Sequence, residues 1–138
     1  MTSIEFYGTG GGLCRPLFGE FLAEAAKAVG RPELKEMAKV YTDLGREWSD
    51  LADAALPDAV PVMGEVKRLL ALRSELTHAG ADPDEVRAVW AKLRELQKET
   101  FPLSEDEYAG LRSDLAPRIK KLYEGESAAL ERLQGMIG

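Results

Sequence analysis

Apolar residues recur every three or four positions along most of the chain, which is the pattern of amphipathic helices that bury one face. The clearest run steps alternately by three and four residues and comprises Leu34, Met37, Tyr41, Leu44, Trp48, Leu51 and Ala55. Acidic residues fill the opposite face, namely Glu36, Asp43, Glu47, Asp50 and Asp53. This spacing predicts one long helix that ends before Pro57.

A shorter helix is expected ahead of this one. Pro16 suits its first turn and Gly30 its C-terminal stop, because proline lacks an N–H and glycine tolerates a left-handed backbone. Its apolar stripe comprises Leu17, Phe18, Phe21, Leu22, Ala25 and Val29. The apolar residues within Ser3–Tyr7 predict a short strand before it.

Three further helices follow Pro57. We expect them over Val62–Ala79, from Pro83 with Asp82 as N-cap, and after the capping box that begins at Ser104. Pro117 is expected to break or kink the last one. The fold class is therefore all-α: a bundle of five to six helices with one short N-terminal strand-like segment and a glycine-rich loop. We expect one helical domain over 1–138, with strand and loop in 1–15 and the bundle in 16–138.

Composition narrows the class of protein. The chain is 45% hydrophobic and 30% charged, as in soluble globular domains, and its net charge of −6 disfavours nucleic acid and anionic membranes. It has no apolar run long enough to span a membrane, and no signal peptide is recognisable. One cysteine and one histidine, His78, exclude a Cys/His zinc site. We expect a cytoplasmic protein without metal or cofactor.

The segment from Gly8 to Arg15 is the main candidate site. Four glycines within five positions need a reason, because glycine loses the most conformational freedom on folding. The segment matches neither the dinucleotide fingerprint nor a nucleotide-triphosphate loop. Its backbone amides, the adjoining helix start and Arg15 favour an anionic group. The alternative is a tight structural connection.

Other residues offer weaker signals. Cys14 precedes a helix start, a position that activates thiols, but no base is near, so a small packed side chain is the alternative. Helically spaced aromatic residues either line a pocket or form core. The sequence also has two clusters of charged residues. One is the acidic face of the second helix, and the other consists of the basic residues around Pro117. Each cluster either binds a partner or is solvated. The expected substrate-binding residues are Gly8, Thr9, Gly10, Gly11, Gly12, Cys14, Arg15, Phe18, Tyr41 and Trp48.

The run from Gly8 to Ala26, together with the spacing of Tyr41, Leu44, Gly45, Trp48 and Leu51, resembles a bacterial helical domain of unknown function. That domain follows the N-terminal domain of butirosin biosynthesis protein H and its relatives. The resemblance implies an acyltransferase system that moves an aminoacyl chain from a carrier protein onto an aminoglycoside amine. The nucleophilic cysteine of such proteins belongs to the N-terminal domain, whose motif these 138 residues do not contain. The glycine segment with Arg15 would then face the active-site cleft.

Three functions remain open. The first is the accessory or substrate-binding helical half of a split acyltransferase, partnered by a separately encoded cysteine-domain subunit or a second copy. An acyl carrier protein or small-molecule substrate would then be bound too. The second is an independent protein or small enzyme that binds a pathway intermediate through the glycine segment. The third is a helical dimerisation module without ligand. Whether the chain is itself catalytic stays open.

Overall fold

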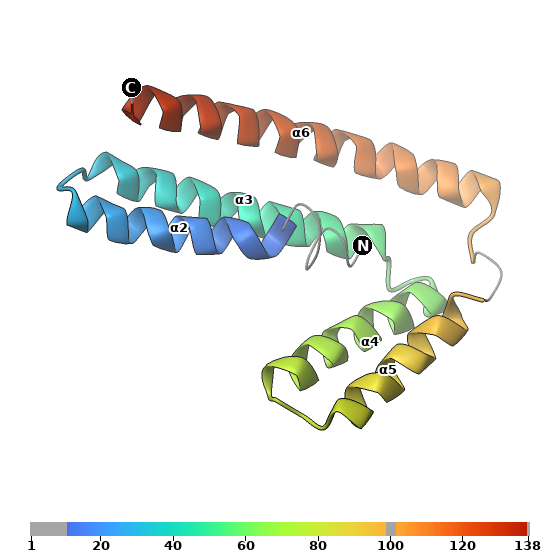
Figure 1. Cartoon of the computed structure of the whole chain (residues 1–138). Coiled ribbons are helices and arrows are strands. Elements are labelled where there is room, and N and C mark those ends of the chain that lie inside the picture. The colour runs from blue at the N-terminus through green and yellow to red at the C-terminus, as the bar shows by residue number, and fades with distance from the viewer. Residues whose placement is uncertain (1–10, 99–101, 138) are drawn as a thin grey trace. The chain divides into compact units, whose positions relative to one another are not determined.

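The protein is all-α in a computed structural model that describes residues 11–98 and 102–137 (Figure 1). The described residues form five helices and no strand. They are α2 (Gly11–Ala28), α3 (Glu33–Ala55), α4 (Pro61–His78), α5 (Pro83–Leu96) and α6 (Glu105–Ile137). The predicted fold class is therefore confirmed. The strand expected at Ser3–Tyr7 lies outside the described residues.

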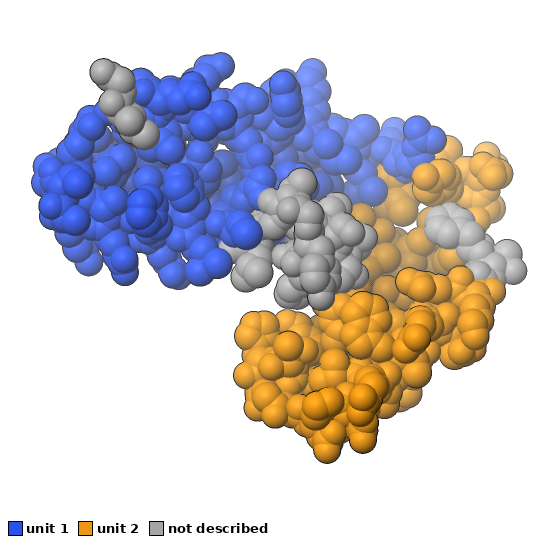
Figure 2. Space-filling model, viewed as in Figure 1, with its two compact units in different colours: residues 1–52, 112–138 blue, residues 53–111 orange. Residues whose placement is uncertain are grey.

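The chain divides into two compact units, coloured separately in Figure 2. Unit 1 combines residues 1–52 with 112–138, and unit 2 comprises residues 53–111. Unit 1 thus joins two stretches that lie far apart in the sequence. The prediction of one helical domain over 1–138 stays a prediction.

Unit 1 is built on three helices. Helices α2 and α3 form an antiparallel hairpin, and the second half of α6 runs alongside it (Figure 1). All three helices contribute to one hydrophobic core of Leu22, Ala26, Leu34, Met37, Ala38, Leu44, Leu51, Leu122, Ala129 and Leu133. The core includes four members of the expected stripe of α3, and the two aromatic residues of that stripe are half-buried beside it.

Two glycines let α2 and α3 approach closely. A Cβ at Gly19 would lie 2.7 Å from the carbonyl oxygen of Ala38, and one at Gly45 would lie 2.6 Å from Cδ of Pro16. Real Cβ atoms do not approach neighbours this closely, so any larger residue would force the helices apart. The hairpin therefore depends on close backbone packing at these two positions.

The start of the first helix differs from the prediction. Helix α2 begins at Gly11, and Pro16 lies inside it. The proline removes the helical hydrogen bond to the carbonyl of Gly12, but its ring packs on Gly45, where no side chain stands in the way. Helix packing has therefore overridden the local preference of proline for the first turn.

The expected burial of α2 is also partly wrong. Leu17, Phe21 and Val29 are 55%, 59% and 61% exposed, whereas Leu22 is buried. Only part of the apolar stripe can contact α3 and α6. The end of the helix is as expected: Gly30 has a φ of 67°, and the amide of Arg31 donates to the carbonyl of Ala26 at 3.1 Å.

The last helix is continuous through Pro117, so the break that was predicted there as one alternative is absent, and a kink stays a prediction. Its N-terminus carries the predicted capping box. The amide of Ser104 donates to the Glu107 carboxylate at 2.8 Å, and the amide of Glu107 donates back to the Ser104 hydroxyl at 3.3 Å. Several large apolar residues of α6 are exposed, and they are Tyr108, Ile119, Tyr123 and Leu130.

Unit 2 contains the hairpin of α4 and α5. Leu69, Val89 and Leu93 form its small buried core. Trp90 is 38% exposed, and the guanidinium of Arg73 lies 4.8 Å from its ring centre. The side chain of Asp82 accepts from the amide of Asp84 at 2.8 Å, which confirms the predicted N-cap.

Candidate functional site

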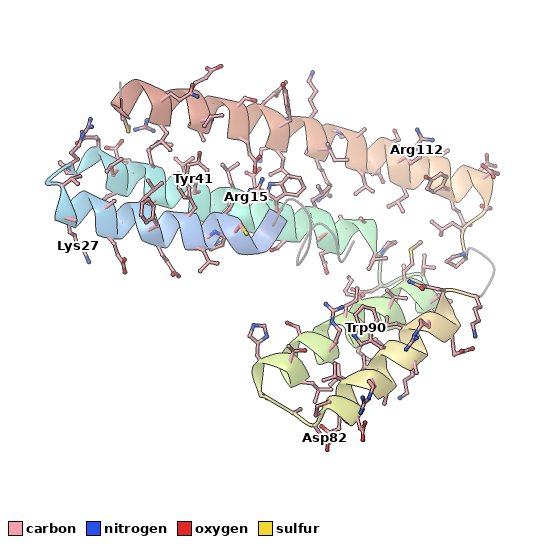
Figure 3. The ribbon with its side chains drawn as sticks, in the orientation of Figure 1. Arg15, Lys27, Tyr41, Asp82, Trp90 and Arg112 are labelled. Atoms are coloured by element: carbon pink, nitrogen blue, oxygen red, sulfur yellow. The ribbon has the colours of Figure 1, made fainter. Side chains whose placement is uncertain are left out.

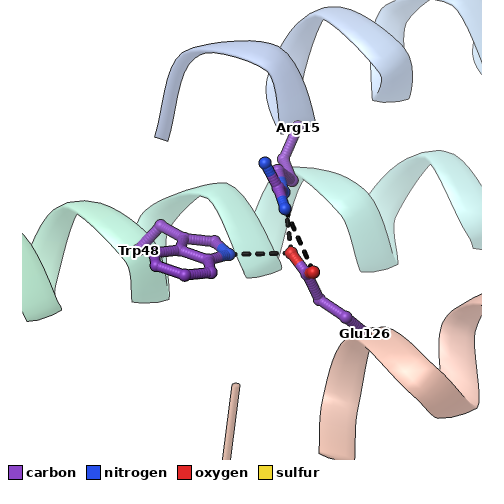
Figure 4. A network of polar contacts seen from close by, with 3 residues as sticks. All are labelled: Arg15, Trp48 and Glu126. Atoms are coloured by element: carbon purple, nitrogen blue, oxygen red, sulfur yellow. Dashed lines mark hydrogen bonds and ion pairs between the residues drawn. The ribbon is translucent and has the colours of Figure 1, made fainter. Parts of the chain in front are cut away.

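Arg15 of α2 and Glu126 of α6 form the main polar contact of unit 1 (Figure 4). Nε of Arg15 donates to Oε1 of Glu126 at 2.7 Å, and a second guanidinium nitrogen donates to Oε2 at 3.0 Å. The indole N–H of Trp48 on α3 donates to the same Oε1 at 2.7 Å. One carboxylate therefore links all three helices of the unit, in the two-pronged geometry that favours arginine.

The surroundings of this carboxylate favour its ionised form. Burial alone would raise the pKa of Glu126, but the hydrogen bonds from Arg15 and Trp48 and the charge of Arg15 outweigh it, so the pKa is lowered. The guanidinium also lies 5.3 Å from the ring centre of Trp48, which adds a cation–π contact. The ion pair is consequently a satisfied polar cluster.

A pocket of about 570 Å³ opens beside this cluster. Its walls come from α2, α3 and α6, and the lining residues are Cys14, Arg15, Phe18, Tyr41, Tyr123, Glu126, Ser127 and Leu130. Figure 3 shows Arg15 and Tyr41 on the side of the α2–α3 hairpin that faces α6. The rings of Phe18 and Tyr41 meet edge to face with centres 4.7 Å apart. The pocket is of the size that small-molecule sites have.

The charges of Arg15 and Glu126 affect the pKa of Tyr41, which lines the same pocket. Burial raises the pKa of the Tyr41 phenol, and the negative charge of Glu126 raises it further, although Arg15 opposes this. Tyr41 therefore presents a neutral hydroxyl at the pocket, which can donate or accept a hydrogen bond.

Most of the expected site residues gather in unit 1. Cys14, Arg15, Phe18 and Tyr41 line the pocket, and Trp48 holds Glu126 from α3. Cys14 is exposed, contrary to the expectation of a small packed side chain. The assignment of these residues to substrate binding stays a prediction.

The glycine segment is only partly described. Gly8, Thr9 and Gly10 lie outside the described residues, while Gly11 and Gly12 form the first turn of α2 and Gly12 is buried. These two glycines are therefore helical, and the expected loop does not extend to them. Arg15, expected to favour an anionic ligand, is engaged by the protein's own Glu126.

Four lining residues were missed by sequence reasoning, and all lie on α6: Tyr123, Glu126, Ser127 and Leu130. The importance of Glu126 could have been inferred from the sequence. It falls one turn after Leu122 and one turn before Ala129, both buried, so it is a carboxylate on an otherwise apolar helix face. Such a residue needs a partner, which a cation from a distant segment supplies.

The charged clusters are mostly paired. Lys121 of α6 bonds to Glu47 of α3 at 2.8 Å, so each cluster neutralises part of the other. Among the described residues, no group of three or more His, Cys, Asp or Glu side chains is placed to hold a metal ion. No helix within the described ranges is both long and apolar enough to cross a membrane.

The N-terminal part of the chain matches the model of a protein family. The model of the family described as Domain of unknown function (DUF4872) matches residues 1–79, so the chain belongs to that family. The match covers α2, α3 and α4, including the residues that contribute to the pocket from α2 and α3. Comparison with curated proteins and with solved structures gives no match.

Proposed function

We propose that unit 1 is a binding module that receives an uncharged, largely apolar group in the pocket between α2, α3 and α6. The observation that carries the proposal is the internal pairing of its two charged residues. Because Arg15 and Glu126 satisfy each other at 2.7 and 3.0 Å, a ligand gains little by bringing its own charge. The remaining contact surface comes chiefly from Phe18, Tyr41 and Leu130.

The resemblance of Gly8–Ala26 to the domain beside butirosin biosynthesis protein H suggests a setting for such a module. We propose that the chain acts as the accessory or substrate-binding half of an acyltransferase system, with the acyl chain or acceptor in the pocket. The nucleophile would then belong to a separate cysteine-domain subunit. An acyl chain is apolar and a thioester carbonyl is an uncharged acceptor, so both suit this lining.

Tryptophan fluorescence gives a direct test of binding. Trp48 bonds to a lining residue, whereas Trp90 lies in unit 2, so a Trp90→Phe protein reports on the pocket alone. The probes are hexanoyl and acetyl thioesters of N-acetylcysteamine. We expect saturable fluorescence changes with the hexanoyl probe and weaker binding of the acetyl probe, since the longer chain buries more apolar surface.

A pair of variants on one helix locates the site. Ser127→Phe fills the pocket, whereas Ser113→Phe adds the same ring at an exposed position of α6 outside the lining. We expect the first variant to weaken hexanoyl binding by about tenfold or more and the second to leave it unchanged. Equal affinities in both variants would place the binding elsewhere and reject the proposal.

The acyltransferase setting has its own test. Co-expression with a cysteine-domain protein encoded in the same gene neighbourhood should give a complex that elutes as one species. Acyl transfer by the cysteine-domain protein should then need this chain and should fall with Ser127→Phe. Transfer that proceeds equally without the chain would reject the setting and leave the binding test untouched.

A further inference from the structure

Helix α6 carries an exposed apolar stripe that its own unit does not cover. Ile119, Tyr123 and Leu130 are 51%, 72% and 51% exposed, and their spacing of four and seven residues puts them on one helix face. Single exposed apolar residues are ordinary on a protein surface, but a row of them indicates an interface.

The stripe continues across the pocket onto α2. Tyr123 and Leu130 line one side of the pocket, and Phe18 lines the other. Phe18 stacks on Phe21 with ring centres 5.9 Å apart, and Phe21 is 59% exposed. Two helices thus present apolar side chains around the same pocket.

Two opposite charges beside the stripe could pair with the same two residues of a second copy. Lys120 and Glu131 lie on the same outer edge of it, because eleven residues are close to three helical turns. Lys120 is 76% exposed and its contact with Glu124 is long, at 3.7 Å. The stripe therefore has a cation near one end and an anion near the other.

We propose that a second copy of this chain covers the stripe in a two-fold symmetric dimer, with the two α6 helices antiparallel. A two-fold axis between Tyr123 and Leu130 places each of these residues against the other in the second copy. The same axis brings Lys120 close to Glu131 of the second copy, since the midpoints of the two pairs differ by about 1.5 Å along the helix. By symmetry, this charge pair forms twice.

The dimer would also complete the pocket. Tyr123 and Leu130 line the pocket and are exposed, so a second copy packed on them covers that side of the pocket. This consequence rests on the proposed binding function, whereas the dimer itself does not. The occupant is inferred from the charge pattern, because an antiparallel second copy pairs opposite charges at both ends of the stripe.

Charge reversal tests the arrangement by sedimentation equilibrium without any ligand. We expect the unaltered protein to dimerise. Lys120→Glu and Glu131→Lys should each weaken the dimer about tenfold or more, because each replaces two attractive contacts by two repulsive ones. An equimolar mixture of the two variants should regain the original affinity. In the mixed dimer, one copy has acidic residues at both positions and the other has basic residues, so both contacts are attractive again.

Lys39→Glu is the matched control, because it makes the same charge change at an exposed position of α3, the helix that is not part of the stripe. It should leave the dimer affinity unchanged. Monomers at all concentrations, or a mixture no tighter than the single variants, would overturn the proposal. Titration of the hexanoyl probe into Lys120→Glu distinguishes the proposed binding function from the proposed dimer. If this variant dimerises weakly and still binds the probe, the pocket binds the probe without the dimer.

Discussion

Glu126 of α6 accepts hydrogen bonds from the other two helices of unit 1. It accepts from Arg15 at 2.7 and 3.0 Å and from Trp48 at 2.7 Å, and its side chain is 29% exposed. Hydrogen bonds to charged groups in such partly buried places contribute more than surface ion pairs do. The carboxylate therefore both fixes α6 to the hairpin and shapes one wall of the pocket.

Replacing this carboxylate should cost stability. Glu126→Gln keeps the size of the side chain but removes the charge that Arg15 faces, so we expect a loss of about 1–3 kcal/mol in the free energy of unfolding. Glu47→Gln is the control, because its partner Lys121 is 73% exposed and the pair is solvated. The control should cost less than about 1 kcal/mol. Urea denaturation measures both, and equal losses would contradict the prediction.

The same carboxylate predicts a pH dependence. Its folded pKa lies below the ordinary value of 4.5, so the native state binds its proton less readily than the unfolded state. The stabilisation is complete above that ordinary value and is lost as the pH falls through the folded pKa. The stability difference between the unaltered protein and Glu126→Gln should be constant from about pH 6 to 8 and shrink below about pH 4.5. A difference that stays constant down to about pH 3 would contradict this.

At the level of residues, four of the eight residues that line the pocket were among those named from the sequence. Arg15, Phe18 and Tyr41 could be predicted because they stand near an unusual glycine segment or recur at helical spacing. The α6 contribution could not, since Glu126 lies 111 positions from Arg15 and no local pattern specifies that pairing. The place of that carboxylate on an apolar helix face was a signal, but its partner depends on tertiary packing.

Helix pairing in unit 1 depends on where side chains are missing. Gly19 faces the backbone of Ala38, and Gly125 of α6 faces Leu44, where an added Cβ would lie 3.2 Å from Cδ2. By contrast, a Cβ at Gly135 of α6 would meet nothing within 4 Å. Gly19 and Gly125 therefore allow close helix packing, whereas Gly135 does not. Each of the three lowers helix propensity to a similar extent.

Alanine substitutions separate these two kinds of glycine. Gly19→Ala should destabilise the protein by about 1–3 kcal/mol, because the new methyl group overlaps the Ala38 carbonyl. Gly135→Ala should stabilise it by up to about 1 kcal/mol, because alanine is the better helix former and no contact opposes it. Thermal unfolding followed by circular dichroism measures both. Stabilisation by both substitutions would show that the helices leave room for a methyl group at position 19, which would contradict the close packing of α2 on α3.

At the level of the elements, helix ends that are fixed by a nearby capping residue were predicted correctly. Gly30, Asp82 and the capping box at Ser104 act as expected because they satisfy backbone groups within a few residues. Pro16 was predicted wrongly as a helix start, and the break that was one of the two alternatives at Pro117 is absent. Pro16 is held by its packing on Gly45, a contact that local sequence does not encode.

Burial was predicted where a helix has neighbours along its whole apolar face. Four residues of the α3 stripe are buried as expected because α2 and α6 both pack on it, and Tyr41 and Trp48 are half-buried. The outer apolar residues of α2 and α6 are exposed because the three helices of unit 1 leave those faces uncovered. Periodicity reveals which residues share a face, but it does not say whether that face meets the same chain or another molecule.

The two units of the whole molecule differ in their cores. Unit 1 buries ten apolar residues in one cluster, whereas the cluster of unit 2 has three, counted over the described residues. Small cores give little independent stability, so we expect unit 2 to unfold at lower urea concentration than unit 1. Each unit holds one tryptophan, Trp48 in unit 1 and Trp90 in unit 2, which makes the two transitions separable.

Single-tryptophan variants measure this order directly. In Trp48→Phe the emission comes from Trp90 and follows unit 2, while in Trp90→Phe it follows unit 1. Trp48→Phe removes a hydrogen bond to Glu126 in unit 1, but unit 1 is not the unit that this variant reports on. Each variant therefore reports on the unit that it leaves unaltered, and the two midpoints are compared between the variants. Coincident transitions in both variants would show that the units unfold as one cooperative body, which would support the single helical domain expected from the sequence.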